Sequence, residues 1–362
     1  MSLLSSGRVG ESPHRQLSSK GFLGTGLGQY FMPTFVCVDP RSGEVYIADS
    51  LNHRVVCCGA DLTPSHVVGA RGDGDDQVLC PYGLAIDAER RELYVADAGN
   101  HRVQVFALAE AVAGRDCRAR SVRRFGVLEA PYGVALDPRE GGLVYVADAN
   151  KHCVTAFTRE GVWAVTFGSM GSALGELMYP RGMVFLAEYD RLVVCDSENH
   201  RLHLFSSKGE PVGVIGSLGA QPGEFKLPFD IAIDQTCQGT WVTDRGNSRL
   251  QLLSFEGRSV RTLSLITSLP CGVAFDARLG SLYVVDTGKH CVQVFGNQPS
   301  HHPVLTLDQL LENAGISHLK AKLLEMGADI NTIMVLTPEQ LIQLGVPPLK
   351  ATFAIQQLQR DS

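Results

Sequence analysis

Six aspartates recur along the chain, and each is followed four and five residues later by His, Arg, Ser or Cys. Such residues can bind metals or act as acids and bases. A catalytic site is asymmetric, however, whereas this set recurs in every copy. We therefore expect each aspartate to accept backbone N–H groups across a tight turn, and each His or Arg to donate toward a neighbouring carboxylate or carbonyl. The predicted structural residues are Asp49, Asp97, Asp148, Asp196, Asp244, Asp286, His53, Arg54, His101, Arg102, His200 and Arg201.

The alternative chemistry is metal binding. The acidic run at residues 72–76 (GDGDD) offers oxygen ligands for calcium, but it lacks the spacing of a helix–loop–helix site, so we predict a solvated loop. No C-x-x-C pair occurs among the ten cysteines, which argues against a zinc finger or a RING-type module. We expect free, mostly buried thiols, no bound metal and no cofactor.

The aspartates lie in segments that repeat, beginning VYIADSLNHRVVCC at residue 45 and LYVADAGNHRVQVF at residue 93. Their separations are 48, 51, 48, 48 and 42 residues. A second apolar run with Pro at its start precedes each copy, as in PYGLAID from Pro81. Short runs of β-branched residues between Gly, Pro, Asn and Asp favour strands, and four strands per period of this length are typical of a propeller blade. The sequence therefore predicts a mainly β fold, a six-bladed β-propeller with four-stranded antiparallel blades.

A propeller must close into a ring, because a terminal blade would otherwise leave an apolar face bare. We expect one end of the chain to add the outer strand of the last blade. The N-terminal run Leu3–Val9 is the first candidate, and residues 302–307 are the alternative.

The repeated core resembles that of the NHL repeat, V-x-D-x-x-N-H-R-V-Q-V-F, over residues 20–296. The copies with Lys151-His152-Cys153, Asn247-Ser248-Arg249 and Lys289-His290-Cys291 depart from it. The resemblance implies a propeller whose loop face binds proteins or, in some members, single-stranded RNA. Other propellers of related sequence are metal-dependent lyases or lactonases, and many NHL propellers belong to ubiquitin ligases.

Residues that do not repeat lie beside the repeated framework, where loops on a rigid scaffold carry binding. Aromatic and basic side chains could anchor a peptide. They could also bind single-stranded RNA, with the rings stacked on bases and the basic groups on phosphates. Alternatively, the rings plug the mouth of the channel. The predicted binding face comprises Tyr82, Tyr132, Arg181, Phe229, Lys151, Arg245 and Lys289.

After residue 296 the apolar period changes from two to about 3.6. We expect a linker at residues 297–304 and a bundle of five short helices at 305–362. Residues 336–346, LTPEQLIQLGV preceded by a helical pattern, resemble the sterile alpha motif (SAM) domain. The resemblance implies protein binding and possible homo- or hetero-oligomers, although Leu349–Thr352 differ from the family's pattern at the start of the last helix.

Composition limits the function classes. The net charge is −6 with a pI of about 6.0, which argues against coating nucleic acid by bulk charge. No run of about 20 apolar residues predicts a membrane span, and the first ten residues lack the apolar core of a secretory signal. We therefore expect a cytoplasmic, non-enzymatic scaffold or ubiquitin-ligase adaptor with protein partners at the propeller face and at the SAM-like domain. Single-stranded RNA binding is the alternative, and a metal-dependent lyase or lactonase is the second alternative.

Overall fold

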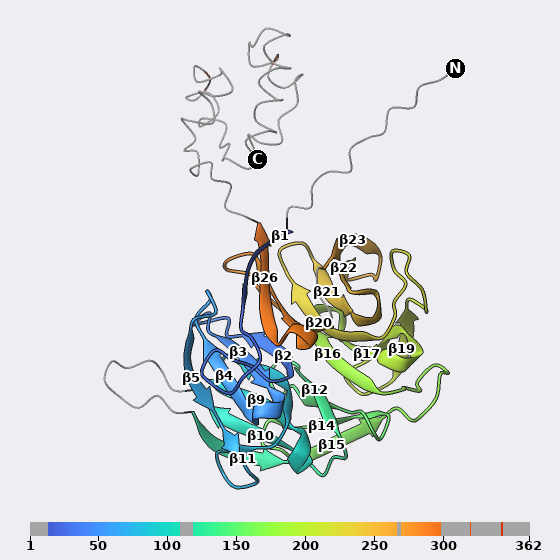
Figure 1. Cartoon of the computed structure of the whole chain (residues 1–362). Coiled ribbons are helices and arrows are strands. Elements are labelled where there is room, and N and C mark those ends of the chain that lie inside the picture. The colour runs from blue at the N-terminus through green and yellow to red at the C-terminus, as the bar shows by residue number, and fades with distance from the viewer. Residues whose placement is uncertain (1–13, 109–118, 266–268, 298–318, 320–341, 343–362) are drawn as a thin grey trace. The chain divides into compact units, whose positions relative to one another are not determined.

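The computed structural model of the chain describes residues 14–108, 119–265 and 269–297, together with Leu319 and Ile342. The chain divides into two compact units, Met1–Asn297 and Gln298–Ser362. In the first unit, six four-stranded antiparallel sheets follow one another around a common axis (Figure 1). The predicted six-bladed propeller is thus confirmed. The predicted linker beyond Asn297 and the predicted helical bundle lie outside the described residues, apart from Leu319 and Ile342.

Each blade starts with an inner strand and adds strands outward. Blade 1 contains β2 (Pro33–Val38), β3 (Val45–Asp49), β4 (Arg54–Cys58) and β5 (Pro64–Val68). Blade 2 contains β8 (Pro81–Asp87), β9 (Glu92–Asp97), β10 (Arg102–Ala107) and β11 (Arg120–Phe125). Blade 3 contains β12 (Pro131–Leu136), β13 (Val144–Asp148), β14 (Cys153–Phe157) and β15 (Trp163–Phe167).

Blade 4 contains β16 (Pro180–Leu186), β17 (Arg191–Asp196), β18 (Arg201–Phe205) and β19 (Pro211–Ile215). Blade 5 contains β20 (Pro228–Asp234), β21 (Gly239–Asp244), β22 (Arg249–Ser254) and β23 (Ser259–Ser264). Blade 6 contains β24 (Pro270–Asp276), β25 (Ser281–Asp286), β26 (Cys291–Asn297) and β1 (His14–Lys20). The short strands β6 (Ala70–Arg71) and β7 (Gln77–Val78) pair in the loop before blade 2.

One face of the propeller, here named the turn face, carries the turn between the second and third strands of every blade and the start of every inner strand. The register shows this, because Pro33 pairs with Asp49 and Asp49 pairs with Arg54. Five of these turns are short 3₁₀ helices, η1 (Ser50–Asn52), η2 (Ala98–Asn100), η4 (Ser197–Asn199), η5 (Arg245–Asn247) and η6 (Thr287–Lys289). A further one, η3 (Ala187–Tyr189), connects β16 to β17 on the opposite face.

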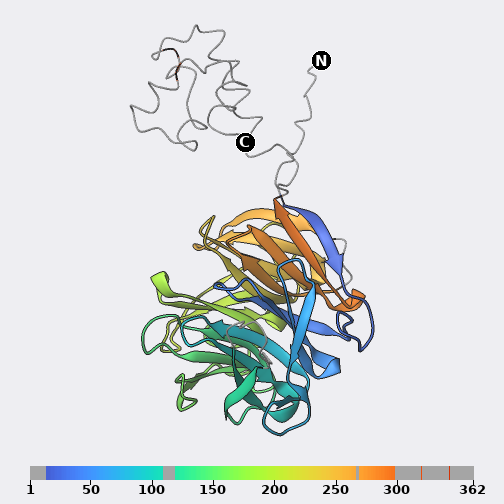
Figure 2. The ribbon, with the colours of Figure 1, turned by 90° about the vertical axis from the view of Figure 1, so that its left-hand side faces the viewer.

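The ring is closed by the N-terminal part of the chain. Strand β1 pairs antiparallel with β26, from His14 opposite Asn297 to Lys20 opposite Val292. Figure 2 shows the blue first strand beside the orange last blade. The expectation of N-terminal closure is confirmed, but the proposed segment was wrong. The closing strand is His14–Lys20 rather than Leu3–Val9, and Leu3–Val9 lie outside the described residues.

The core lies between blades, because successive residues of a strand point to opposite faces of its sheet. In β9, Leu93 and Val95 pack toward blade 1, while Tyr94 and Ala96 pack toward blade 3. Six buried clusters of this kind fill the six blade-to-blade interfaces, including the one between blades 6 and 1, where Tyr283 and Val285 meet Ile47. Closure therefore buries the same kind of apolar surface as every other interface.

Glycine at the third position of four of the six inner strands allows these strands to approach their neighbours closely at the axis. A Cβ added to Gly133 would lie 2.2 Å from the carbonyl oxygen of Arg181, and one added to Gly83 would lie 2.1 Å from that of Tyr132. Backbone atoms cannot yield as a flexible side chain can. We predict that Gly133→Ala lowers the free energy of unfolding by about 3 kcal/mol.

Urea denaturation would measure this loss, with Gly213→Ala in β19 as the control. A Cβ at Gly213 meets no atom within 4 Å. That substitution should change stability by less than about 0.5 kcal/mol. Equal stability of the two variants would contradict the proposed close approach.

Among the residues that the structure describes, no helix is long and apolar enough to span a membrane.

Candidate functional site

The repeated aspartates bind backbone and side-chain donors at the turn face. In blade 2, Asp97 accepts hydrogen bonds from Leu79 N (2.6 Å), Asn100 Nδ2 (2.8 Å) and Arg102 Nε (2.8 Å). Arg102 also donates to the carbonyl oxygens of residues 73, 74 and 77 in the loop that precedes β8. The carboxylate and the guanidinium together hold this loop against the blade. Asp49, Asp196 and Asp244 bind their arginines Arg54, Arg201 and Arg249 in the same way.

Blades 3 and 6 lack the arginine, and their preceding loops differ. Asp148 accepts from the backbone N–H groups of Glu129 and Ala130, both at 2.9 Å. Asp286 accepts from Leu269 N and Lys289 N, both at 3.2 Å. Cys153 and Cys291 stand where the other blades have arginine. The loop before β12 spans only residues 126–130. It therefore lacks the segment whose carbonyl oxygens the arginine binds in the other blades. This explains the Lys-His-Cys departure from the repeat in blade 3.

The repeated histidines connect one blade to the next. His53 has a left-handed backbone conformation at the end of η1, and its Nδ1 accepts a hydrogen bond from Cys80 N at 3.1 Å. His152, His200 and His290 accept in the same way from Tyr179, Leu227 and Met32. The prediction that these histidines donate is therefore wrong in these four blades. The donor is the backbone N–H of the residue before the proline. His101 differs, since its Nδ1 lies 2.7 Å from the carbonyl oxygen of Glu129.

The second residues of the inner strands meet at the centre of the turn face. Tyr82 and Tyr132 stack with ring centroids 4.4 Å apart, and Tyr132 meets Phe229 edge-on at 6.4 Å. The guanidinium of Arg181 lies 4.8 Å from the Tyr132 ring and 4.9 Å from the Phe229 ring, and that of Arg245 lies 5.3 Å from Phe229. Phe35 completes the packing, 5.4 Å from Phe229. We name the set Phe35, Tyr82, Tyr132, Arg181, Phe229 and Arg245 the central cluster.

Burial divides the predicted binding residues. Phe229 is only 3% exposed, so it forms a base for the cluster and offers no ring to a partner. Tyr82, Tyr132, Arg181 and Arg245 are half-buried, while Lys151 and Lys289 are exposed on the turns of blades 3 and 6. Lys151 donates to the carbonyl oxygen of Val127 and lies 3.7 Å from Asp148. The rings thus close the mouth of the channel, as in the alternative we considered, and the two arginines cover them.

The apolar residues that surround the central cluster were not predicted from the sequence. The residue before each inner-strand proline is apolar or a cysteine in all six blades, and this pattern in the sequence could have revealed them. These residues are Met32, Cys80, Ala130, Tyr179, Leu227 and Leu269. Met32, Tyr179 and Leu269 are exposed, as are the neighbouring Phe31 and Leu51. The apolar rim, as we name these five exposed residues, places apolar surface around two cationic groups.

The acidic run at residues 72–76 is built into the framework. Arg102 binds two of its carbonyl oxygens, the N–H of Gly74 donates to the side chain of Gln77, and Asp75 lies 3.4 Å from Arg124. Within the described ranges, no group of three His, Cys, Asp or Glu side chains could hold a metal ion. The nine cysteines described there are free.

These features define the class of the first unit as a six-bladed β-propeller. Three segments of it match the family model of the NHL repeat, at residues 32–58, 79–106 and 267–295. These three segments are thus similar to NHL repeats, which occur in propellers that commonly mediate protein interactions. No curated protein matches the sequence.

Several solved structures share the fold. A catalytically inactive virginiamycin B lyase from Staphylococcus aureus with quinupristin is 13% identical, with a TM-score of 0.52, and the match covers 75% of this chain and 82% of that chain. The selenomethionine form of that lyase matches with a TM-score of 0.51 at 13% identity, over 72% and 79% of the two chains. Hydrazine synthase from Kuenenia stuttgartiensis is also 13% identical, with a TM-score of 0.52, over 75% and 97%. Identity this low shows a common fold alone.

Proposed function

We propose that the chain is a non-enzymatic scaffold whose turn face binds a protein partner. The observation that carries this proposal is the pair of guanidinium groups of Arg181 and Arg245 over Phe229. Among the described residues, neither arginine forms an ion pair with a carboxylate, and both are only half-buried. Arginine and aromatic side chains at the centre of a surface are typical of residues that dominate binding.

The chemistry around the pair indicates the kind of partner. A guanidinium group binds carboxylates with two parallel hydrogen bonds, and the apolar rim offers burial on either side. We infer that the turn face binds a peptide segment in which an acidic side chain is flanked by apolar ones. The repeated histidines take no part, because hydrogen bonds to the next blade already occupy them. We assign the chain no catalysis.

Single-stranded RNA is less well supported by the same cluster. Bases would need free aromatic faces to stack on. Tyr82 and Tyr132 stack on each other, Arg181 covers Tyr132, and Phe229 is buried. The exposed Glu129 and Glu198 would also repel phosphates on this face.

We further propose a second partner for the predicted SAM-like domain at residues 305–362. Two binding modules on one chain raise the effective concentration of their ligands for each other. Such a chain would serve as an adaptor, for a ubiquitin ligase among others.

A peptide-phage selection on the immobilised full chain tests the turn face. We predict that selected peptides carry an acidic residue beside apolar ones, and that the double variant Arg181→Gln/Arg245→Gln binds them at least about tenfold more weakly. Fluorescence anisotropy of a labelled selected peptide would measure this.

The control is Lys208→Ala, which removes an exposed charge between β18 and β19 on the opposite face and should leave peptide affinity unchanged. Peptides without acidic residues, or an affinity that the double variant retains, would overturn the proposal. A steep salt dependence for labelled oligouridine, lost when Arg181, Lys151 and Lys289 are replaced by Ala, would favour RNA instead.

A further inference from the structure

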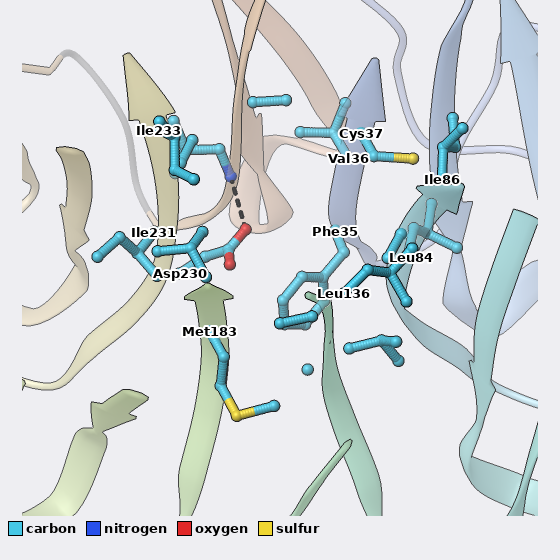
Figure 3. Close-up of a pocket in the computed structure, with 18 of the residues that line it drawn as sticks. Phe35, Val36, Cys37, Leu84, Ile86, Leu136, Met183, Asp230, Ile231 and Ile233 are labelled. Atoms are coloured by element: carbon cyan, nitrogen blue, oxygen red, sulfur yellow. Dashed lines mark hydrogen bonds between the residues drawn. The ribbon is translucent and has the colours of Figure 1, made fainter. Parts of the chain in front are cut away.

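A cavity of about 330 Å³ lies at the axis of the propeller beneath the central cluster (Figure 3). The inner strands of all six blades line it. Phe35 and Asp230 mark its inner end, next to the central cluster. Its other end reaches Pro138, an exposed residue in the loop between β12 and β13. The cavity is therefore separated from the turn face by packed rings and opens toward the opposite face.

The side chains that line this cavity are almost entirely apolar, and polar atoms contribute about as much of its exposed surface as apolar atoms do. The lining residues include Val36, Leu84, Val134, Met183, Ile231 and Val273. Asp230 is the one carboxylate among the lining residues, and it is 6% exposed. It occupies the position where four of the other inner strands have glycine, and a Cβ at Gly182 would lie 2.1 Å from its Oδ1. The neighbouring glycine thus leaves room for this side chain.

The carboxylate has backbone partners but no countercharge. Its Oδ2 accepts a hydrogen bond from Val273 N at 3.0 Å, shown as the dashed line in Figure 3. Among the described residues, no Lys, Arg or His forms an ion pair with Asp230. Burial raises its pKa to about 8. An ionised carboxylate in an apolar wall is costly unless a cation is placed against it.

We propose that this channel cavity binds a small molecule that has a compact apolar body and a single ammonium group, with the ammonium group against Asp230. The apolar wall would bury the body of the ligand. The cavity volume is within the range of small-molecule sites, at its lower end. A purely structural role is the competing explanation, because Asp230 also bridges β20 to β24. The site lies on the other side of the central cluster from the proposed peptide surface, so the two proposals can fail separately.

Isothermal titration calorimetry of the full chain with 2-phenylethylamine tests the proposal, with 2-phenylethanol as the neutral probe of the same shape. We expect the amine to bind at least tenfold more tightly than the alcohol. Asp230→Asn should abolish this preference, because the amide oxygen can still accept from Val273 N but carries no charge. At pH 7 binding of the amine should release a proton from Asp230, which titrations in buffers of different ionisation enthalpy would detect.

Two further variants keep the test decisive. Leu136→Trp fills the channel from β12 and should weaken binding of both probes, whatever the fate of the Asp230 variant. Arg181→Gln alters the turn face and should leave binding of the amine unchanged. Equal affinity for amine and alcohol, amine binding that survives Asp230→Asn in a protein that still unfolds cooperatively, or no binding of the amine up to its solubility limit would each overturn the proposal.

Discussion

Replacing Asp97 with alanine is expected to lower the free energy of unfolding by about 3–5 kcal/mol, because it removes a fully buried carboxylate and leaves the largely buried Arg102 without its partner. The substitution also leaves the N–H of Leu79 and the side chain of Asn100 without an acceptor. Burial raises the pKa of Asp97 even though three donors face it, so the ion pair is not a large net source of stability. The expected loss of stability arises because the substitution removes the carboxylate alone and leaves the guanidinium of Arg102 without a countercharge.

Urea denaturation monitored by tryptophan fluorescence would measure this loss. The matched control is Asp75→Ala in the loop before the same blade, which breaks the exposed ion pair with Arg124 and should cost less than about 1 kcal/mol. The double variant Asp97→Ala/Arg102→Leu should recover part of the loss, because it removes the unpaired guanidinium. A single variant Asp97→Ala that unfolds at the same urea concentration as the parent chain would contradict the structural role of the repeated aspartates.

The stability of the parent chain should fall as the pH rises from about 4 to about 8, relative to that of Asp230→Asn. Asp230 has a folded-state pKa of about 8, whereas an aspartate in an unfolded chain titrates near 4. Between these values the folded state holds a proton that the unfolded state has lost, so raising the pH favours unfolding. The contribution changes by about 1.4 kcal/mol per pH unit within the window and becomes constant above it.

The neighbours of Asp230 do not supply a competing titration in that window. The closest titratable side chains are the thiols of Cys37, Cys195 and Cys271, and burial raises the pKa of each, so they stay neutral. The charged groups on the turn-face side are the guanidinium groups of Arg181 and Arg245. Urea titrations of both proteins at pH 5, 6, 7, 8 and 9 would give the difference in unfolding free energy. A difference that does not change between pH 5 and 8 would show that Asp230 is ionised throughout.

The propeller could be predicted from the sequence because its inner and middle strands are buried. Their apolar alternation recurs with the aspartates, and the predicted four strands per period are found in all six blades. The closing strand was placed at the wrong residues because it is an outer strand and is not buried in this way. Strand β1, HRQLSSK, has one apolar residue, Leu17, which is itself exposed, so an outer strand leaves no apolar pattern to detect.

The candidate sites were only partly predictable. Sequence spacing brings Tyr82, Tyr132, Arg181 and Phe229 to equivalent positions of different blades, but it gives no distance across the axis. Only the packed structure shows that these rings fill the channel mouth and bury Phe229. Asp230 stands in the sequence where four of the other inner strands have glycine, yet its burial depends on the five other inner strands.

The pairing of β1 with β26 has a consequence for biosynthesis. Ser19 and Cys291 are hydrogen-bonded although 272 positions separate them in the chain. A ribosome adds the last blade long after the first strand has emerged, so His14–Lys20 must wait, unpaired, until translation reaches Asn297. Contacts of such long range form slowly, and an exposed strand edge invites association with other chains during that interval. Nascent chains of this protein are therefore expected to depend on chaperones until the final blade is released.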